Sequence, residues 1–320
     1  MSDPISTIKA QPRPEYQTMT RDAGSGCTGP WLLSRLAPFR RLDRRLNSMV
    51  STTDILAAYD SQLRRLVPPA VPAGYEYQLL GPLLRVTGQR RGFIESARDL
   101  GVEGGMLDRL IAEQRDYFAG RGEAVEWKTR AHDLPSDLDA RLRAAGFAPE
   151  ERETVLVGET AAIAGDPAVP EGIRVRLARE RIDLERVAAM KSEVWASDYS
   201  WVAGDLQHRL ASDPANLVVF MAEASGVVVS AAWLEINPGS DFAGLWCGST
   251  LPAWRGRGIY KALVAARAQV AAARGVKYLQ VDASADSEPI LRRLGFRAIT
   301  TTTPFVWTPP VRGHSPGALG

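Results

Sequence analysis

The chain has 320 residues, of which 45% are apolar and 24% are charged, and its formal net charge is +2. This length allows two domains with ordinary hydrophobic cores. The near-neutral charge argues against nucleic acid or an anionic membrane as the main partner. No run of about 18 apolar residues is present, so we expect no transmembrane helix and no stable membrane association.

Cysteine and histidine are too sparse to organise the protein. Cys27 and Cys247 are far apart, and three histidines are scattered along the chain. We therefore expect neither a disulfide framework nor a metal site, and a reducing, cytoplasmic location. The first residues also lack the basic-then-apolar order of a secretory signal.

Residues 1–50 are expected to be a disordered or loosely helical extension. Residues 1–30 are rich in Pro, Gly, Ser and Thr and lack periodicity. Residues 31–50 have leucines at helical spacing with arginines between them, interrupted by Pro38. We interpret this stretch as a loosely docked or dispensable helix, with a basic helix lying on an anionic membrane as the alternative. Met49 is a candidate natural start because the folded pattern begins just after it.

Residues 51–160 have the pattern of a small mixed α/β domain. A helix is expected over residues 54–67, where Pro68 and Pro69 would end it. Gly and Pro then separate the later elements. The strands are expected at 75–80, 83–88, 92–98, 124–130 and 154–157, and the helices at 105–119 and 136–145. Residues 161–171, with Ala, Gly and Pro, are expected to be a linker.

Residues 172–308 repeat this order of elements. The central strands are expected to form an antiparallel meander, turned at Ser225-Gly226 and Pro238-Gly239. The strands are expected at 173–177, 217–223, 227–236, 242–250, 277–282 and near 304–307, and the helices at 182–197, 205–211, 258–274 and 287–294. Residues 309–320 are Pro/Gly-rich and are expected to be a flexible tail.

The repeat also appears in individual residues. Gly105 to Gly122 spans the same seventeen steps as Gly258 to Gly275, and each pair opens and closes a predicted helix. A strand and a second helix ending in Gly-Phe follow both. Two copies of one mixed α/β unit are the simplest interpretation; chance similarity between two α/β halves is the alternative.

A Gly- and Arg-rich turn precedes the 258–274 helix, with the sequence Arg255-Gly256-Arg257-Gly258-Ile259-Tyr260. Its glycines allow a tight turn with outward N–H groups, its arginines add positive charge, and the helix adds the positive end of its dipole. This combination predicts a cradle for a phosphate-bearing ligand. A turn that only redirects the chain is the alternative.

Residues 173–307 resemble the GCN5-related N-acetyltransferase (GNAT) superfamily. Arg255 to Gly258 match, in order, the family's Arg/Gln-x-x-Gly-x-Gly/Ala turn, which binds the pyrophosphate of acetyl-CoA, with Tyr260 where the last Gly or Ala is usual. Residues 247–251 correspond to the family's β-bulged strand, and residues 292–296 to its helix ending in Leu-Gly-Phe. The resemblance implies an α/β protein of two tandem GNAT-like domains, each with a mixed, largely antiparallel sheet flanked by helices.

The first half looks like a degenerate copy of this fold. Val102-Glu103-Gly104-Gly105 takes the place of the Arg/Gly turn, and both arginines are absent. Since Glu103 would repel a pyrophosphate, we predict that this copy does not bind acyl-CoA and instead shapes the substrate cleft or stabilises the pair. Four charged or titratable residues lie on and just after its last long strand: Glu126, Lys128, His132 and Asp133. We interpret them as a solvated rim, with a position facing a substrate as the alternative.

The resemblance also implies how acetyl-CoA would be held. The pyrophosphate would meet the N–H groups of the turn, and the pantetheine arm and oxyanion would meet the backbone of the bulged strand. The implied residues are Ser249, Thr250, Leu251, Arg255, Gly256, Arg257, Gly258, Ile259 and Tyr260. Family members often place a Tyr general acid where this chain has Leu291, which cannot donate a proton. Ser284 and Ser287 are candidates for that role, with N-capping as the alternative.

Carboxylates and aromatic residues supply the remaining candidates. Glu193 and Glu235 are candidate bases, together with Asp198 and Glu223, and an exposed carboxylate is the alternative for each. Tyr199 and Trp201, expected in a loop, are candidates for the acceptor pocket. Cys247 is expected to be a buried structural thiol.

These observations predict an acetyl-CoA-dependent N-acyltransferase that moves an acetyl group to an amine of a small molecule or peptide by direct attack in a ternary complex. A non-catalytic acyl-CoA-binding or regulatory module is the alternative, favoured by Leu291. Transfer of an aminoacyl group from tRNA is a third class, against which the near-neutral charge argues. The acceptor, the acyl length and whether the chain forms a homodimer stay open.

Overall fold

The computed structural model describes residues 6–7 and 51–310. The predictions for the N-terminal extension and Met49, and for the tail beyond residue 310, lie outside the described residues, apart from Ser6 and Thr7. These two residues form β1, which pairs antiparallel with β2.

The first half contains the elements expected from its pattern. Helix α1 (Thr52–Gln62) is shorter than predicted, because the chain leaves the helix at Leu63 and Arg65 takes a positive φ of 57° well before the two prolines. The other main elements are β2 (Glu76–Leu80), β3 (Leu83–Thr87), β4 (Gly92–Ser96), α2 (Gly104–Arg121), β5 (Val125–Arg130), α3 (Leu138–Ala144), β6 (Ala148–Pro149) and β7 (Glu153–Glu159).

The second half follows the predicted order, and its antiparallel meander β9–β10–β11 is confirmed. Its elements are β8 (Ile173–Leu177), α5 (Arg181–Trp195), α6 (Trp201–Ser212), β9 (Leu217–Ala224), β10 (Val227–Ile236), β11 (Phe242–Thr250), the 3₁₀ turn η1 (Pro252–Trp254), α7 (Ile259–Ala273), β12 (Tyr278–Ala283), α8 (Glu288–Arg293) and β13 (Arg297–Trp307).

Two local expectations were wrong. The segment expected to be a linker begins with helix α4 (Thr160–Ile163), whose Ile163 is buried in the main core. Trp201 is the first residue of α6 and not part of a loop. In both places a short apolar stretch gains burial by coiling against the core, which the local sequence alone does not reveal.

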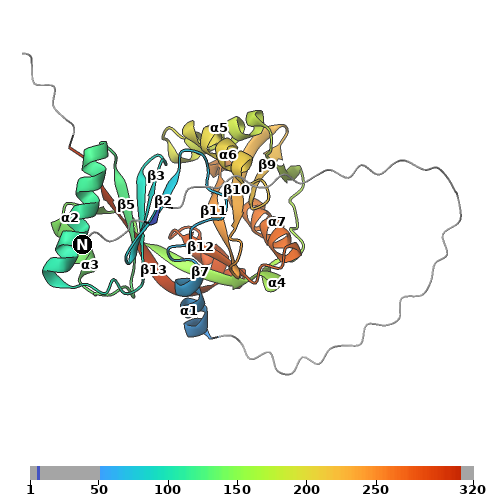
Figure 1. The fold of residues 1–320 in the computed structure, drawn as a ribbon. Coiled ribbons are helices and arrows are strands. Elements are labelled where there is room, and N and C mark those ends of the chain that lie inside the picture. Colours follow the sequence, from blue (N-terminus) through green and yellow to red (C-terminus); the bar gives the residue numbers. More distant parts are fainter. Residues whose placement is uncertain (1–5, 8–50, 311–320) are drawn as a thin grey trace, which may run out of the picture.

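The strands form one mixed sheet, in the order β1-β2-β3-β4-β5-β13-β7-β12-β11-β10-β9-β8, with β6 beside β13. The two halves exchange their last strands. β13 of the second half pairs antiparallel with β5 of the first, and β7 of the first half lies between β13 and β12. Figure 1 shows the result: β7, β12 and β13 cross the centre of the molecule and join the two halves.

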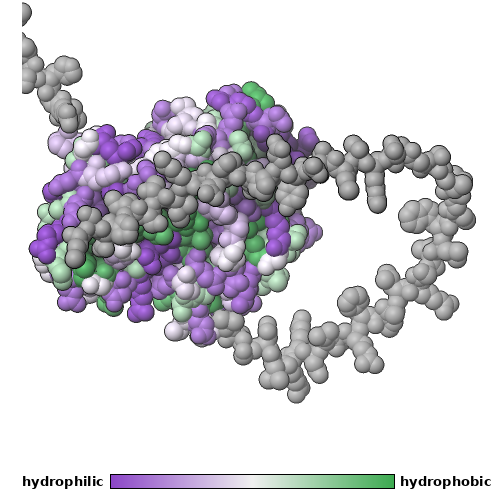
Figure 2. Space-filling model, in the orientation of Figure 1, coloured by the Kyte–Doolittle hydropathy of each residue, from purple (hydrophilic) through white to green (hydrophobic). Residues whose placement is uncertain are grey.

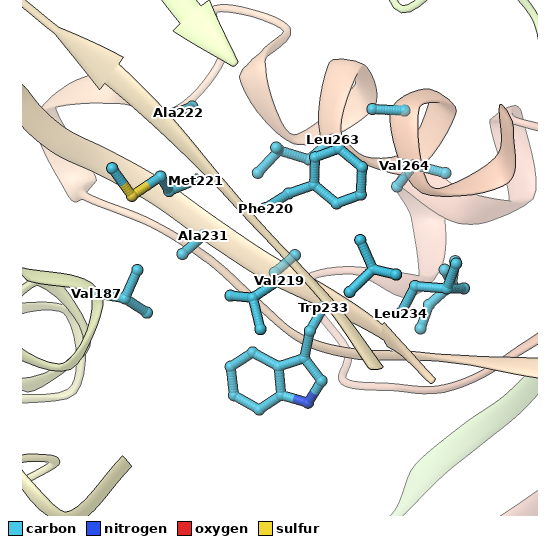
Figure 3. Close-up of a cluster of buried hydrophobic side chains, with 14 of the residues drawn as sticks. Val187, Val219, Phe220, Met221, Ala222, Ala231, Trp233, Leu234, Leu263 and Val264 are labelled. Carbon is cyan, nitrogen blue, oxygen red and sulfur yellow. The ribbon is translucent and has the colours of Figure 1, made fainter. Parts of the chain in front are cut away.

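Apolar side chains from both faces of the sheet build the core. The largest cluster packs β9 and β10 between α7 and α5. Figure 3 shows Phe220 next to Leu263 and Val264 of α7 on one side of these strands, with Val187 and Trp233 on the other. The alternation of side chains along each strand thus supplies two helix-covered faces.

The outer surface differs from this core. Figure 2 shows a face that is mostly hydrophilic, with hydrophobic residues gathered in its middle part. Within residues 51–310, no helix combines the length and hydropathy that a membrane span requires.

Candidate acetyl-CoA site

The predicted Gly/Arg turn lies at the start of α7. Gly256 and Gly258 have positive φ values of 75° and 87°, a conformation that glycine adopts without strain. Gly258 is the N-cap of α7, and no side chain caps the helix, so its first N–H groups keep free hydrogen-bonding capacity. The Arg255 Nε donates to the Thr250 carbonyl at 3.2 Å, and the Arg257 guanidinium lies 4.6 Å from the Trp254 ring centroid.

Strand β11 separates from β12 just before this turn. The parallel pairing runs only from Phe242↔Tyr278 to Gly244↔Gln280. A bulge follows, at which two residues, Cys247 and Gly248, face one residue of β10, and Cys247 has a φ of 52°. Diverging strands leave backbone groups unpaired, and these can bind an extended ligand arm.

A cavity of about 730 Å³ opens at this divergence. It brings together most of the predicted acetyl-CoA residues with both predicted serines. The predicted residues among its lining are Ser249, Thr250, Arg255, Gly256, Arg257, Gly258, Ile259, Tyr260, Ser284 and Ser287. Leu251 lies next to the lining and is buried, with its N–H donating to the Val229 carbonyl at 2.9 Å.

Tyr260 lies under the bulged strand. Its ring is close to Gly248, where an added Cβ would come within 2.7 Å of the ring. The large ring in the place of the usual small residue therefore packs against a glycine of the neighbouring strand.

The two serines lie at the head of α8. Their Oγ atoms are 3.3 Å apart, and the Ser287 Oγ also donates to the Ser284 carbonyl at 3.3 Å. Ser287 is the N-cap residue, but its side chain makes no capping hydrogen bond. Both hydroxyls line the cavity, whereas the Leu291 side chain is fully buried.

The other predicted residues do not line this cavity. Glu193 is exposed, and the Glu235 carboxylate accepts from Arg209 at 2.7 Å. The Tyr199 and Trp201 rings stack with centroids 6.0 Å apart. Their roles stay predictions.

Sequence reasoning missed Lys191 of α5. Only 2% of Lys191 is exposed, yet no ion pair among the described residues involves it. Its Nζ donates to the Ser249 Oγ at 3.2 Å and to the Cys247 carbonyl at 3.3 Å, and burial lowers its pKa. Its position between Val187 and Val194 on the apolar face of the predicted helix was the available signal.

Cys247 is exposed and not buried as expected. It lies in the bulge, where the extra residue interrupts the regular in-and-out alternation of a strand. Strand periodicity therefore could not place its side chain.

In the first half, hydrogen bonds bridge the strand gap that corresponds to the β11–β12 opening, although a cavity of about 530 Å³ lies at the start of α2 and is lined by Val102 and Glu103. Beyond the end of β4, the Leu134 N–H donates to the Arg98 carbonyl at 2.8 Å, and the Leu100 N–H donates to the Leu134 carbonyl at 3.0 Å. The Arg64 Nε donates to the Ser96 carbonyl at 2.8 Å. These bonds use backbone groups at the position where β11 stays open in the second half.

Comparison with known proteins agrees with this geometry. Residues 182–296 match the model of the acetyltransferase (GNAT) family, so this part of the chain is a GNAT domain. No curated protein sequence gave a significant match.

Solved structures show the same fold over most of the chain. A GCN5-related N-acetyltransferase from Kribbella flavida is similar with a TM-score of 0.58 and 18% identity, covering 84% of this chain and 98% of that one. A tandem GNAT protein from the clavulanic acid biosynthesis pathway has a TM-score of 0.55 and 14% identity, covering 80% and 94%. A GCN5-related N-acetyltransferase from Sphaerobacter thermophilus has a TM-score of 0.52 and 16% identity, covering 73% and 76%.

Proposed function

We propose that the protein is an acetyl-CoA-dependent N-acyltransferase that moves an acetyl group to an amine of a small molecule or peptide by direct attack in a ternary complex. The observation that carries this proposal is the cavity that joins the Gly/Arg turn to the open end of β11. A positive, amide-rich end suits a pyrophosphate, and an unpaired strand suits the pantetheine amides. We also propose a cytoplasmic location, supported by the sparse cysteines.

In this proposal, the N–H groups from Gly256 to Tyr260 hold the pyrophosphate, since the Arg255 N–H is bonded to the Pro252 carbonyl, and the two arginines add charge. The backbone from Ser249 to Leu251 lies along the thioester carbonyl, where an N–H donor stabilises the oxyanion that develops during attack; the Leu251 N–H is not that donor, because it is bonded to the Val229 carbonyl. The Lys191 Nζ supports this segment through its bonds to Ser249 and Cys247.

Proton transfer is assigned to serines that line the cavity and to carboxylates outside it. The Ser284 or Ser287 hydroxyl supplies a proton to the leaving thiolate, because both line the cavity and form a hydroxyl pair. Glu193 and Glu235 remain candidate bases, although the ion pair with Arg209 makes Glu235 a weaker one. Tyr199 and Trp201 remain candidates for the acceptor pocket.

A non-catalytic acyl-CoA-binding module is the second candidate function. It is favoured by one observation: the buried Leu291 occupies the place of the family's usual tyrosine donor.

One experiment separates the two functions. Calorimetry measures acetyl-CoA affinity, and a thiol reagent then detects CoA release in the presence of a broad panel of amines. Binding with amine-dependent release supports the transferase, and binding without release supports the module. Absence of acetyl-CoA binding would contradict both.

A further inference from the structure

The exchanged strand β7 brings an acidic residue of the first half to the open end of β12. β7 pairs with β12 from Glu159↔Tyr278 to Thr154↔Ala283, so the start of β7 lies beside the end of β12. The Thr154 Oγ1 donates to Glu288 at 2.7 Å on the α8 side. Val155 packs instead with α1. Because side chains alternate, Glu153 lies on the face that carries α1.

A buried ion pair lies on the same face. Lys128 of β5 pairs with Asp282 of β12, and Asp282 also accepts from the Gln280 Nε2 at 2.7 Å. The Lys128 Nζ lies 5.9 Å from the ring centroid of Trp246, which directly precedes the bulge of β11. This polar group therefore lies beside the part of β11 that runs into the bulge, although it is not part of the cavity lining.

The Glu153 carboxylate has no such partner. It is partly buried, and it makes no hydrogen bond or ion pair within the part of the chain that the structure describes. Burial raises its pKa to about 7, and Lys128 opposes this effect. The charged groups that face it come from β5, β12 and the segment before β7: Glu126, which Arg91 pairs, Lys128, Asp282 and Glu151.

We propose that Glu153 receives the proton of the amine acceptor, so that the first half contributes a catalytic group to the acetyl-CoA site of the second half. The inference rests on the proposed function. The acceptor that fits is a protonated primary amine, because the Glu153 carboxylate is unpaired and attracts a cation, whereas Asp282 and Glu126 already pair with Lys128 and Arg91. Because β7 pairs with β12, the first half can supply this proton acceptor although the gap next to its own β4 is bridged by hydrogen bonds.

The reaction balances as follows. The ammonium proton moves to the Glu153 carboxylate and leaves a neutral amine. The amine nitrogen bonds to the acetyl carbonyl carbon, and collapse of the tetrahedral adduct breaks the carbon–sulfur bond with the electron pair on sulfur. The Ser284 or Ser287 hydroxyl gives its proton to the thiolate and takes the second amine proton in its place, giving the amide and the CoA thiol, and Glu153 returns its proton to solvent.

Glu153→Gln and Glu151→Gln form a matched pair for the test. Both remove one carboxylate from the same stretch, but Glu151 is exposed and precedes the strand. Acetyl transfer to spermidine, tyramine, glucosamine and lysine is monitored as CoA release. The measurement is made over a range of pH around 7 with the wild type, with both glutamine variants and with Glu153→Asp. Acetyl-CoA affinity by calorimetry and Tm at alkaline pH are measured on the same samples.

Wild-type kcat/KM is expected to rise with pH through about 7, as Glu153 ionises. Glu153→Gln should lose about 100-fold or more in kcat, and its kcat/KM should no longer rise as the pH passes about 7. Glu153→Asp should keep the rise of kcat/KM with pH, and Glu151→Gln should behave as the wild type. Acetyl-CoA affinity should not change.

Three results would overturn the inference. If Glu153→Gln has the rate and the pH dependence of the wild type, the role of Glu153 is contradicted, and the proposed transferase activity is unaffected. A lower Tm or weaker acetyl-CoA binding in Glu153→Gln than in Glu151→Gln identifies a structural role. A wild type that binds acetyl-CoA but acetylates none of these amines overturns the transferase as well.

Discussion

Gly258 provides a direct test of the proposed pyrophosphate site, because the same helix offers a matched control. Gly258 has a φ of 87° at the N-terminus of α7, and Gly275 has a φ of 73° just beyond its C-terminus. An added Cβ would meet only Pro170 Cγ at 3.8 Å in the first case and nothing within 4 Å in the second. Replacing either glycine with a residue that has a Cβ therefore adds similar backbone strain, but only Gly258 lines the cavity.

The backbone strain at both positions and the charge repulsion at position 258 have different magnitudes. Alanine at either position should cost about 1–2 kcal/mol of the free energy of unfolding, because a Cβ is unfavourable at positive φ. Aspartate at 258 adds a charge near the proposed pyrophosphate. At a separation of about 5 Å and an effective dielectric of about 20, one pair of unit charges repels by about 3 kcal/mol. This corresponds to a loss of affinity on the order of 100-fold.

Aspartate at 275 should leave the affinity unchanged. The helix has 15 residues, which separates the two ends by about 22 Å, beyond the screening length at physiological salt. Calorimetric titration of CoA into Gly258→Asp, Gly275→Asp and the two alanine variants measures the difference, and thermal unfolding checks the shared strain. Equal CoA affinity in the two aspartate variants would refute the proposed site.

Three other predictions follow from the fold. Calorimetry should give one CoA per chain, because hydrogen bonds between Leu134 and residues 98 and 100 close the gap in the first half; two would contradict the proposed single site. Residues 165–310 produced alone should be unfolded by circular dichroism, since β12 and β13 then lose β7 and β5; a folded fragment with the Tm of the full chain would show that the exchange is dispensable. The pKa of Glu153 rises on folding from 4.5 to about 7, so its contribution to stability is complete below pH 4.5 and is lost as pH rises through about 7. Allowing for partial exposure, the free energy of unfolding should fall by on the order of 2 kcal/mol over this interval, and urea unfolding should show no such fall in Glu153→Gln.

Much of the proposed acetyl-CoA site could be read from local sequence. The turn from Arg255 to Gly258 needs two left-handed residues before a helix, and glycine at both positions signals this directly. The resemblance to the GNAT family supplied the serines before α8 and residues 249–251, and the cavity includes all of them apart from Leu251.

Other site features depend on contacts that local sequence does not encode. Lys191 is buried because α5 packs across the bulge of β11, and its partners lie more than fifty residues away. Cys247 is exposed because a bulge shifts the alternation at that one position. A period-based prediction assumes regular strands and therefore fails at an irregular one.

By itself, the sequence determined the order and type of most elements and the Gly/Arg turn, because each depends on hydrophobic period and on residues that favour particular backbone angles. Only the tertiary structure decided which strands are neighbours. β7 and β13 each end one half of the chain, yet each pairs with strands of the other half. Pairing between distant strands depends on packing across the whole sheet, and that exchange places β7, which begins with Glu153, beside β12 of the second half.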